Sequence, residues 1–315
     1  MKKGFLWLVT ATLLWSGNYI AGRILAPELP ALAVNAIRWI VSSFVLWPLL
    51  RLSGRNLSVR TTWPRYLTMG FIGMFVFSGL TYLGLDSLPA AQAGMISGTM
   101  PVIILLLSVA ILGERPSGRA WLGVVLSVGG ILVLMGAGRS FRLSAGDLEI
   151  LGSAVAWGLY TVLGKRFSQD LDALTLTTGA AIFGAVPSAL AALTTGSPTL
   201  WHLTSVGWAS LAYVSTLSSV LAYFVWTAGV KMVGAARSAP FMNLLPVWTV
   251  IMGVLLLGEH LVLHQLIGGG VTILGAVVAG SKRTPSPSSI RPEGILSRVG
   301  QEPTHSAARP PESTQ

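Results

Sequence analysis

The sequence predicts an all-α, polytopic membrane protein whose ten transmembrane helices form two inverted repeats of five. Three observations predict this fold: the composition, a series of long apolar segments and an internal repeat. Of the 315 residues, 21 are Lys or Arg and 11 are Asp or Glu, so 10% are charged, against roughly a quarter in a soluble domain. Apolar residues make up 52% of the chain and the mean hydropathy is +0.70. The absence of cysteine excludes disulfides, thiolate metal sites and a Cys nucleophile.

Ten apolar segments follow one another along the chain, each near the roughly 20 residues that a helix needs to cross a hydrocarbon core about 30 Å thick. The short connections leave no room for a soluble catalytic or nucleic-acid-binding domain. Residues 281–315 are poor in apolar residues and rich in Pro and Ser, so we expect a disordered cytoplasmic tail. The apolar segments lie at about 4–26, 30–51, 64–84, 88–112, 118–136, 147–168, 172–195, 204–230, 234–257 and 263–280.

Positively charged residues give the orientation, because Lys and Arg concentrate in cytoplasmic loops. The basic start before the first apolar run is also typical of a signal peptide, but nine further segments favour an uncleaved first helix. With the N-terminus inside, 17 Lys and Arg residues fall on the inner side and two, Arg139 and Arg142, on the outer side. We therefore expect a multi-pass protein of a bacterial inner membrane with both termini in the cytoplasm. The net charge of +10 then reflects topology and not affinity for nucleic acid.

An internal repeat relates the two halves of the chain. A shift of 145 residues aligns identical residues at twelve positions, including a mid-segment proline and a Gly-Glu pair that ends in Glu114 or Glu259. Because each repeat has five segments, the second enters the membrane from the opposite side, which places Glu114 at the inner surface and Glu259 at the outer one. Inverted repeats, here 1–136 and 147–280, are a transporter architecture, since mirrored halves give two similarly stable states open to opposite sides.

The repeated residues, together with a motif in the first segment, resemble a known family. They are similar to the EamA type of the drug/metabolite transporter superfamily over about residues 4–280. The resemblance implies a transporter that exports amino acids or other small metabolites, with the lipid bilayer and a small-molecule substrate as partners. The second Gly-Glu pair is followed by His260, where Arg or Lys is typical, which weakens a fixed ion pair there. The matching residues are Trp15-Ser-Gly-Asn-Tyr19, Leu83-Gly-Leu, Ala90-Ala-Gln-Ala-Gly, Pro101, Leu112-Gly-Glu-Arg115, Gly123, Gly130 and Leu257-Gly-Glu259.

Polar and aromatic residues at membrane depth are candidates for a substrate cavity, because a polar group there is costly unless it faces a cavity or a partner. Trp15, Asn18 and Tyr19 share one face of the first segment at i, i+3 and i+4. A shift of 142 places Trp157 and Tyr160 at the same depth in the sixth segment. We predict that these residues form an aromatic and polar cavity wall; the alternative is packed core. Further candidates are Ser78, Gln92, Ser219, Tyr223 and Asn243.

Two prolines and two sets of small residues shape the segments. Pro101 and Pro246 each remove a backbone hydrogen bond in mid-segment, so we predict helix bends that shape the cavity and act in gating, with static kinks as the alternative. Small residues at 123–130 in the fifth segment and 268–279 in the tenth let helices approach closely, within the chain or between two copies; contact with the substrate is the alternative. We expect a monomer or a homodimer.

Two arginines fall inside apolar segments. Arg23 lies near the outer end of the first segment, where its side chain can reach the surface. Arg38 lies roughly 12 Å inside the second segment at about 1.5 Å per residue, where an unpaired charge is costly. Two roles are open for Arg38: it stabilises helix packing by bonding neighbouring carbonyls or Asn35, or it binds a substrate carboxylate.

The positions of the other titratable residues limit which transport mechanisms the sequence supports. No Asp or Glu lies in the middle third of a segment, which argues against a carboxylate relay and favours facilitated diffusion or exchange. We expect no cofactor and no metal, since His260 and His264 lack a third ligand nearby, and no enzyme, since no nucleophile and base are paired. An aromatic and amide-lined wall fits a neutral or zwitterionic substrate; the alternatives are a sugar phosphate, a nucleotide sugar or a drug, a channel, and least of all an intramembrane enzyme.

Overall fold

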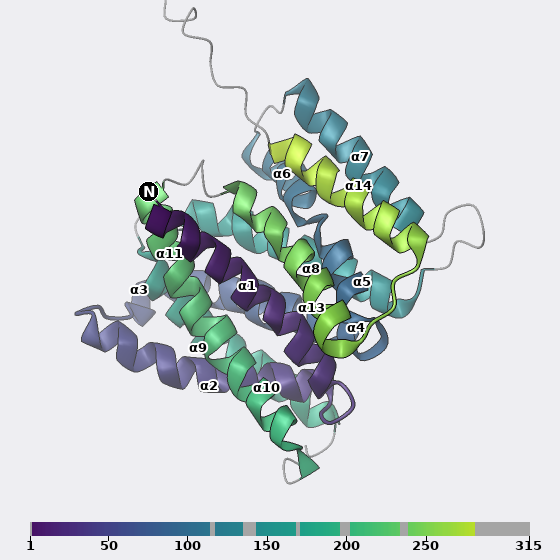
Figure 1. Ribbon diagram of the computed structural model, residues 1–315. Helices are drawn as coiled ribbons and strands as arrows, with labels where there is room; N and C mark the ends of the chain where they lie inside the picture. The colour runs from purple at the N-terminus through teal and green to yellow at the C-terminus, as the bar shows by residue number, and fades with distance from the viewer. Residues whose placement is uncertain are drawn as a thin grey trace, which may run out of the picture. The chain divides into compact units, whose positions relative to one another are not determined.

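The computed structural model describes residues 2–113, 117–134, 143–167, 171–195, 202–233 and 239–280 (Figure 1). Within these ranges the chain is helical and contains no strand, which confirms the all-α class. Residues Met1–Ser281 form one compact unit. The expected tail at 281–315, Glu114 and the two outer arginines, Arg139 and Arg142, lie outside the described residues.

Helices occupy each of the apolar ranges that the sequence predicts, with several of the ranges divided into shorter elements. In chain order these are α1 (Lys2–Leu25), α2 (Ala31–Leu52), α3 (Val59–Met69), the π-helix η1 (Gly70–Phe77), α4 (Ser78–Ser87), α5 (Ala90–Ser97), α6 (Met100–Leu112), α7 (Gly118–Leu134), α8 (Ala145–Phe167), α9 (Ala173–Ala192), the 3-10 helix η2 (Leu193–Thr195), α10 (Ser205–Ser215), the π-helix η4 (Leu217–Leu221), α11 (Ala222–Val233), the 3-10 helix η5 (Ala239–Asn243), α13 (Leu244–Leu257) and α14 (Leu263–Gly280).

Five helical stretches among the described residues are long and apolar enough to cross a membrane. Shorter apolar helices cover Gly118–Leu134, Phe241–Leu257 and Leu263–Val278. Large apolar side chains such as Phe44 and Leu255 are about three-quarters exposed, as expected where the outer surface faces lipid. The five long stretches are Ala31–Leu52, Val59–Ser87, Ala90–Ile111, Ala173–Thr195 and Ser205–Trp226.

Two of the segments contain a π-helical turn at corresponding places. η1 lies in the third segment and η4 in the eighth, and a shift of 145 residues lays 70–77 onto 215–222, which contains η4. A π-helical turn changes the register of the side chains that follow it and is frequent at functional sites. Nothing in the apolar residue pattern predicts either turn.

α7 and α14 pack closely as an antiparallel pair, side by side in Figure 1. A methyl group added to Gly130 would lie 2.5 Å from the Thr272 backbone nitrogen, and one added to Gly275 would overlap the Ser127 backbone. The Ser127 hydroxyl also donates to the Thr272 carbonyl at 2.9 Å. The close packing expected for the small residues is confirmed, and it joins two segments of the same chain.

Carboxylates cap helices at one end of the bundle. Glu259 accepts hydrogen bonds from the Ala90 and Ala91 backbone amides at 2.6 and 2.8 Å, at the positive N-terminus of α5. Glu28 accepts from the Thr204 backbone amide at 3.0 Å, beside the start of α10. Glu259 therefore has helix amides as partners in place of a basic side chain.

Asp172 caps the N-terminus of α9 at the opposite end. Its carboxylate accepts a hydrogen bond from the Thr175 backbone amide at 3.1 Å and lies 3.1 Å from Arg55 Nη1. Partial burial by itself raises the pKa of Asp172, but the hydrogen bonds from Thr175 and the charge of Arg55 outweigh it. The pKa of Asp172 is therefore held below its ordinary value.

We expect Gly130→Ala to destabilise the protein by about 1–3 kcal/mol, as is usual for overpacking, because the new methyl group overlaps the α14 backbone. Gly129→Ala is the matched control, since nothing lies within 4 Å of its added methyl group, and alanine is favoured over glycine in a helix by roughly 0.5–1 kcal/mol. Thermal unfolding in detergent measures both variants. Equal melting temperatures for the two variants would contradict the role of Gly130 in packing.

Asp172→Asn keeps a capping side chain and removes the charge that Thr175 and Arg55 stabilise. Because the folded pKa is lowered, the stabilisation is present above the unfolded value of about 3.9 and is lost as the pH falls through the folded pKa. The wild-type protein should unfold at a higher temperature than the variant near neutral pH, and the gap should close below about pH 4. A gap that does not change on acidification would show that the charge is irrelevant.

Candidate functional site

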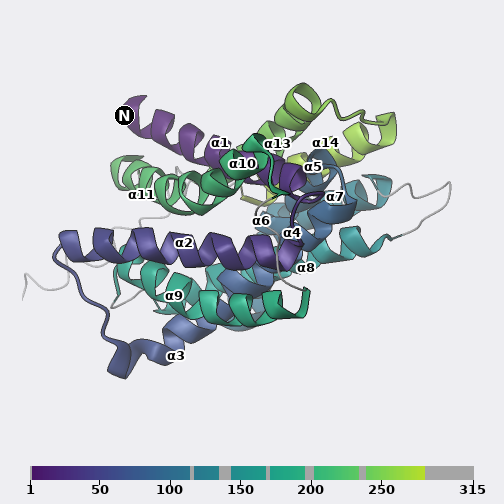
Figure 2. The ribbon, with the colours of Figure 1, turned by 90° about the horizontal axis from the view of Figure 1, so that it is seen from below.

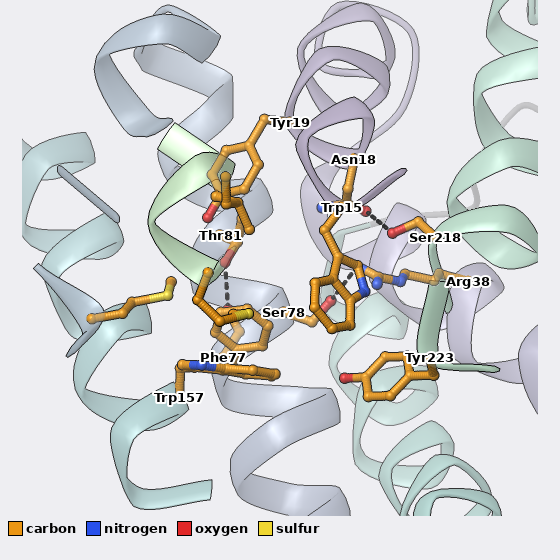
Figure 3. Close-up of a pocket in the computed structure, with 13 residues that line it drawn as sticks. Trp15, Asn18, Tyr19, Arg38, Phe77, Ser78, Thr81, Trp157, Ser218 and Tyr223 are labelled. Atoms are coloured by element: carbon orange, nitrogen blue, oxygen red, sulfur yellow. Dashed lines mark hydrogen bonds between the residues drawn. The ribbon is translucent and has the colours of Figure 1, made fainter. Parts of the chain in front are cut away.

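A narrow cavity of about 50 Å³ lies among helices from both halves of the chain (Figure 3). Its wall combines aromatic rings, hydroxyl groups, an amide and one guanidinium group, and no Asp or Glu is among its described lining residues. The lining residues are Trp15, Asn18, Tyr19, Arg38, Phe77, Ser78, Thr81, Met100, Trp157, Ser218, Tyr223, Met242 and Leu245.

Two aromatic pairs form opposite parts of the wall, as Figure 3 shows. Trp15 of α1 meets Tyr223 of α11 edge to face, with ring centroids 5.4 Å apart. Trp157 of α8 meets Phe77 of η1 with centroids 4.9 Å apart. Tyr160 stacks on Trp157 at 5.4 Å from behind the wall. Such rings offer apolar faces that also attract cations.

Arg38 brings a positive charge to the wall from α2. The residue is buried, with 5% of its surface exposed. Its Nε donates to Ser219 Oγ at 2.8 Å, and its Nη1 donates to Ser78 Oγ at 3.2 Å and to Tyr82 Oη at 3.0 Å. The guanidinium also lies over the Trp39 ring, 4.8 Å from the centroid. Arg38 thereby ties α2 to α4 and η4.

The hydroxyl groups around Arg38 are themselves oriented. Ser219 Oγ donates to a backbone carbonyl of α10 at 2.7 Å, and Tyr82 Oη donates to Asn18 Oδ1 at 2.9 Å. Ser218 Oγ is a second donor to Asn18 Oδ1, at 3.5 Å. Since a hydroxyl has a single proton, the Ser219 and Tyr82 oxygens present only lone pairs to Arg38. The oxygen of the Asn18 amide belongs to this network.

The structure gives Arg38 other hydrogen-bond partners than the structural role predicted from the sequence. Among the described residues, the hydrogen-bond partners of Arg38 are side-chain hydroxyls, with no backbone carbonyl among them. Asn35 instead donates from its amide to the Met74 carbonyl at 3.2 Å and to Ser188 Oγ at 3.0 Å. Among the residues that the structure describes, no Asp or Glu forms an ion pair with Arg38. A buried cation held by neutral hydroxyls keeps its full charge, which an anion can offset.

Most of the residues predicted for the cavity lie on its wall. Tyr160 and Ser219 stand one layer behind, where they contact the wall residues Trp157 and Arg38. Asn243 ends η5 next to the wall residue Met242. The predicted residues that line the cavity are Trp15, Asn18, Tyr19, Arg38, Ser78, Trp157 and Tyr223.

Gln92 is not among the described residues that line this cavity. Gln92 Nε2 donates to Asp147 Oδ1 at 3.0 Å, and Gln265 Nε2 donates to Gln92 Oε1 at 3.0 Å. α5 begins at Ala90, so Gln92 sits in the first turn, too near the helix end to reach the cavity. Its amide joins the starts of α5, α8 and α14.

Several wall residues are not among those predicted from the sequence. Most are apolar side chains in apolar segments, where the pattern does not distinguish a cavity from lipid or core. Phe77 and Ser218 belong to the π-helical turns η1 and η4, whose altered register no helical-wheel argument anticipates. The missed wall residues are Phe77, Thr81, Met100, Ser218, Met242 and Leu245.

Pro101 and Pro246 lie in the first turns of helices that start in mid-segment. α5 ends at Ser97 and α6 begins at Met100, while η5 gives way to α13 at Leu244. Proline suits the first turn of a helix because the missing N–H has no partner there. The predicted bends therefore take the form of helix breaks, at corresponding places in the two halves and next to the cavity residues of α6 and η5.

Comparison with known proteins places the chain in a family. The model of the EamA-like transporter family matches residues 2–136 and again residues 144–281. The chain belongs to this family.

Two relatives are described as uncharacterized transporters of Bacillus subtilis (strain 168). YyaM is 32% identical over 220 residues, which cover 68% of the EamA-like chain and 72% of YyaM. YetK is 26% identical over 284 residues, or 88% of this chain and 86% of YetK. A crystal structure with a TM-score of 0.64 and 23% identity, covering 89% of this chain and 96% of the other, shares the fold. The EamA-like chain is thus a multi-pass membrane transporter.

Proposed function

We propose that this EamA-like protein exports small metabolites, namely amino acids or related neutral and zwitterionic compounds, by alternating access of two inverted five-helix repeats around the cavity. One observation carries the proposal: the wall has matched aromatic pairs that cross between the two halves. Trp15 pairs with Tyr223, and its repeat mate Trp157 pairs with Phe77. The first pair joins the first and eighth segments, and the second pair joins the sixth and third. These are corresponding segments when the two halves of the chain are interchanged.

The packing of α7 against α14 supports inverted repeats. Gly130 packs on Thr272, and Gly275 packs on Ser127. A shift of 145 residues converts one contact into the other, as an approximate twofold axis requires. The antiparallel course of the two helices fits an axis in the plane of the membrane.

The packing between whole helices shows the same correspondence between the two halves of the chain. α1 packs against α11 and α13, and α8 packs against α4 and α6, which are the corresponding segments of the other half. α2 and α9, the second and seventh segments, pack on each other (Figure 2). The two matches to the family model support repeats at 1–136 and 147–280.

Alternating access needs one end of the cavity to be held while the other end opens. Glu259 on the α5 amides and Glu28 beside α10 hold one end through hydrogen bonds that must break for it to open. From the distribution of Lys and Arg we assign this to the outer end, with both termini in the cytoplasm of a bacterial cell. The protein works as a monomer or a homodimer and uses no cofactor.

The wall favours a neutral or zwitterionic substrate over a sugar phosphate or nucleotide sugar. Recognition of phosphate typically uses several Lys or Arg side chains or helix N-termini, whereas Arg38 is the one cationic residue on the described wall. Aromatic faces together with amide and hydroxyl groups suit an amino acid with an apolar side chain.

Counterflow in proteoliposomes tests transport. Vesicles loaded with one unlabelled amino acid should take up the same labelled amino acid several-fold faster than unloaded vesicles, because a carrier exchanges substrate across the membrane. The double variant Trp15→Ala, Trp157→Ala should lose most of this exchange, since it removes both aromatic pairs. Trp121→Ala is the matched control, because Trp121 lies on α7 with 47% of its surface exposed.

High conductance without this acceleration would mean a channel. Failure of every amino acid to exchange would reject the substrate class, and a screen of other metabolites would then identify the class that exchanges.

The double variant Pro101→Leu, Pro246→Leu tests gating. Leucine restores the backbone N–H that proline lacks, so continuous helices become more stable and exchange should slow several-fold at unchanged substrate affinity. Pro48→Leu is the control, since Pro48 lies inside α2 on an exposed face. An unchanged exchange rate in the double variant would leave the two breaks as static features.

A further inference from the structure

Arg38 has an unusual electrostatic setting for a residue that only holds helices together. It is 95% buried, and its three hydrogen bonds within the described residues all go to neutral hydroxyl groups, those of Ser78, Tyr82 and Ser219. Among the described residues it has no acidic partner. A buried charge without a counter-ion is costly, so bringing an anion to the guanidinium gives a large favourable interaction.

Arg38 and Asn18 each have a hydrogen-bond donor that no described residue accepts from, and these donors indicate what kind of anion could bind. The hydrogen bonds of Arg38 use Nε and Nη1, and none from Nη2 is found in the described part of the chain. The bonds of Asn18 use Oδ1, which accepts from Tyr82 and Ser218, and none from its Nδ2 is found there either. Arg38 and Asn18 both line the cavity and lie near each other in Figure 3. The wall thus presents unused donors.

The rest of the wall limits the charge of the ligand. One guanidinium balances one negative charge, so a carboxylate fits and a phosphate dianion leaves an excess. No Asp or Glu on the described wall can receive an ammonium group, so an amino group would contact aromatic faces such as those of Trp15 and Trp157. The same faces suit an apolar or aromatic body.

We propose that Arg38, assisted by Asn18 Nδ2, is the carboxylate-binding site of the cavity, and that its ligands are monocarboxylates with an apolar or aromatic body, amino acids included. This inference rests on the proposed transport through the cavity. The guanidinium recognises the carboxylate, and the aromatic pairs accept the body. Arg38 therefore acts on the substrate directly, while Ser78, Tyr82 and Ser219 position it.

Matched pairs of carboxylates and amides test the site in purified, full-length protein. The probes are L-phenylalanine and L-phenylalaninamide, L-leucine and L-leucinamide, and phenylacetate and phenylacetamide, with sodium chloride as the inorganic anion. Quenching of tryptophan fluorescence reports binding, because Trp15 and Trp157 line the cavity. At least one carboxylate should bind about tenfold or more tightly than its amide.

Substitutions separate binding from folding. Arg38→Gln should weaken the carboxylate about tenfold or more, and Arg38→Lys should also weaken it, since lysine keeps the charge and loses the planar fork. Arg23→Gln is the control, because Arg23 donates to the Leu85 and Asp86 carbonyls outside the cavity. Asn18→Asp keeps the side-chain shape and supplies an internal carboxylate. It should abolish carboxylate binding while the melting temperature is retained or raised.

Several outcomes would overturn the carboxylate site: equal binding of amides and carboxylates, no binding of any carboxylate, an equal fluorescence change with sodium chloride, or unchanged binding in Asn18→Asp. Counterflow of an uncharged or cationic metabolite that Arg38→Lys leaves unchanged would overturn it too, while transport stands. Carboxylate binding that depends on Arg38, without counterflow, would instead keep the site and reject transport.

Discussion

Backbone hydrogen bonding is the constraint on which the rest of this structure depends. In an apolar surrounding each N–H and C=O group must be bonded within its own helix, and irregular backbone is tolerated where it is buried in protein or lines a cavity. The described chain follows this rule. Four departures from regular α-helix inside the apolar segments, at η1, at η4, between α5 and α6 and at η5, supply or adjoin the wall residues Phe77, Ser218, Met100 and Met242, while η2 lies at the end of its segment.

These departures have an energetic consequence. In a regular α-helix every interior backbone group is hydrogen-bonded in one arrangement, so bending costs free energy. At a helix break or a π-helical turn, backbone groups can form hydrogen bonds in more than one arrangement. Such places are where a segment can bend at low cost. They occur in corresponding segments of the two halves, where the proposed alternating access would use them.

Charge is the second organising element, and it is distributed unevenly. At the ends of the helices, carboxylates meet helix amides or an arginine, as Glu259 and Asp172 do. In the interior, Arg38 meets hydroxyl groups and aromatic rings. Glu259 and Asp172 are therefore stabilised by partners within the protein. Arg38 on the cavity wall has no acidic partner among the described residues.

Much of the fold was predictable because lipid imposes a simple pattern: apolar runs gave the helical segments, and the i, i+3, i+4 spacing put Trp15, Asn18 and Tyr19 on one wall. Small residues at regular spacing also predicted close helix packing, and the structure shows that α7 and α14 are the partners.

A polar residue in an apolar segment predicts a polar partner but not which one. Gln92 is an example, since its partners are Asp147 and Gln265. Phe77 and Ser218 show another limit, because a π-helical turn leaves no trace in hydropathy.

The sequence by itself determined the all-α class, the family and the presence of a buried arginine, since each of these depends on residue type and spacing along one chain. Only the tertiary structure decided what surrounds that arginine. The partners of Arg38 are 40, 44 and 181 residues away along the chain, and whether a distant side chain is a hydroxyl or a carboxylate at contact distance depends on how the helices pack, which no local pattern encodes.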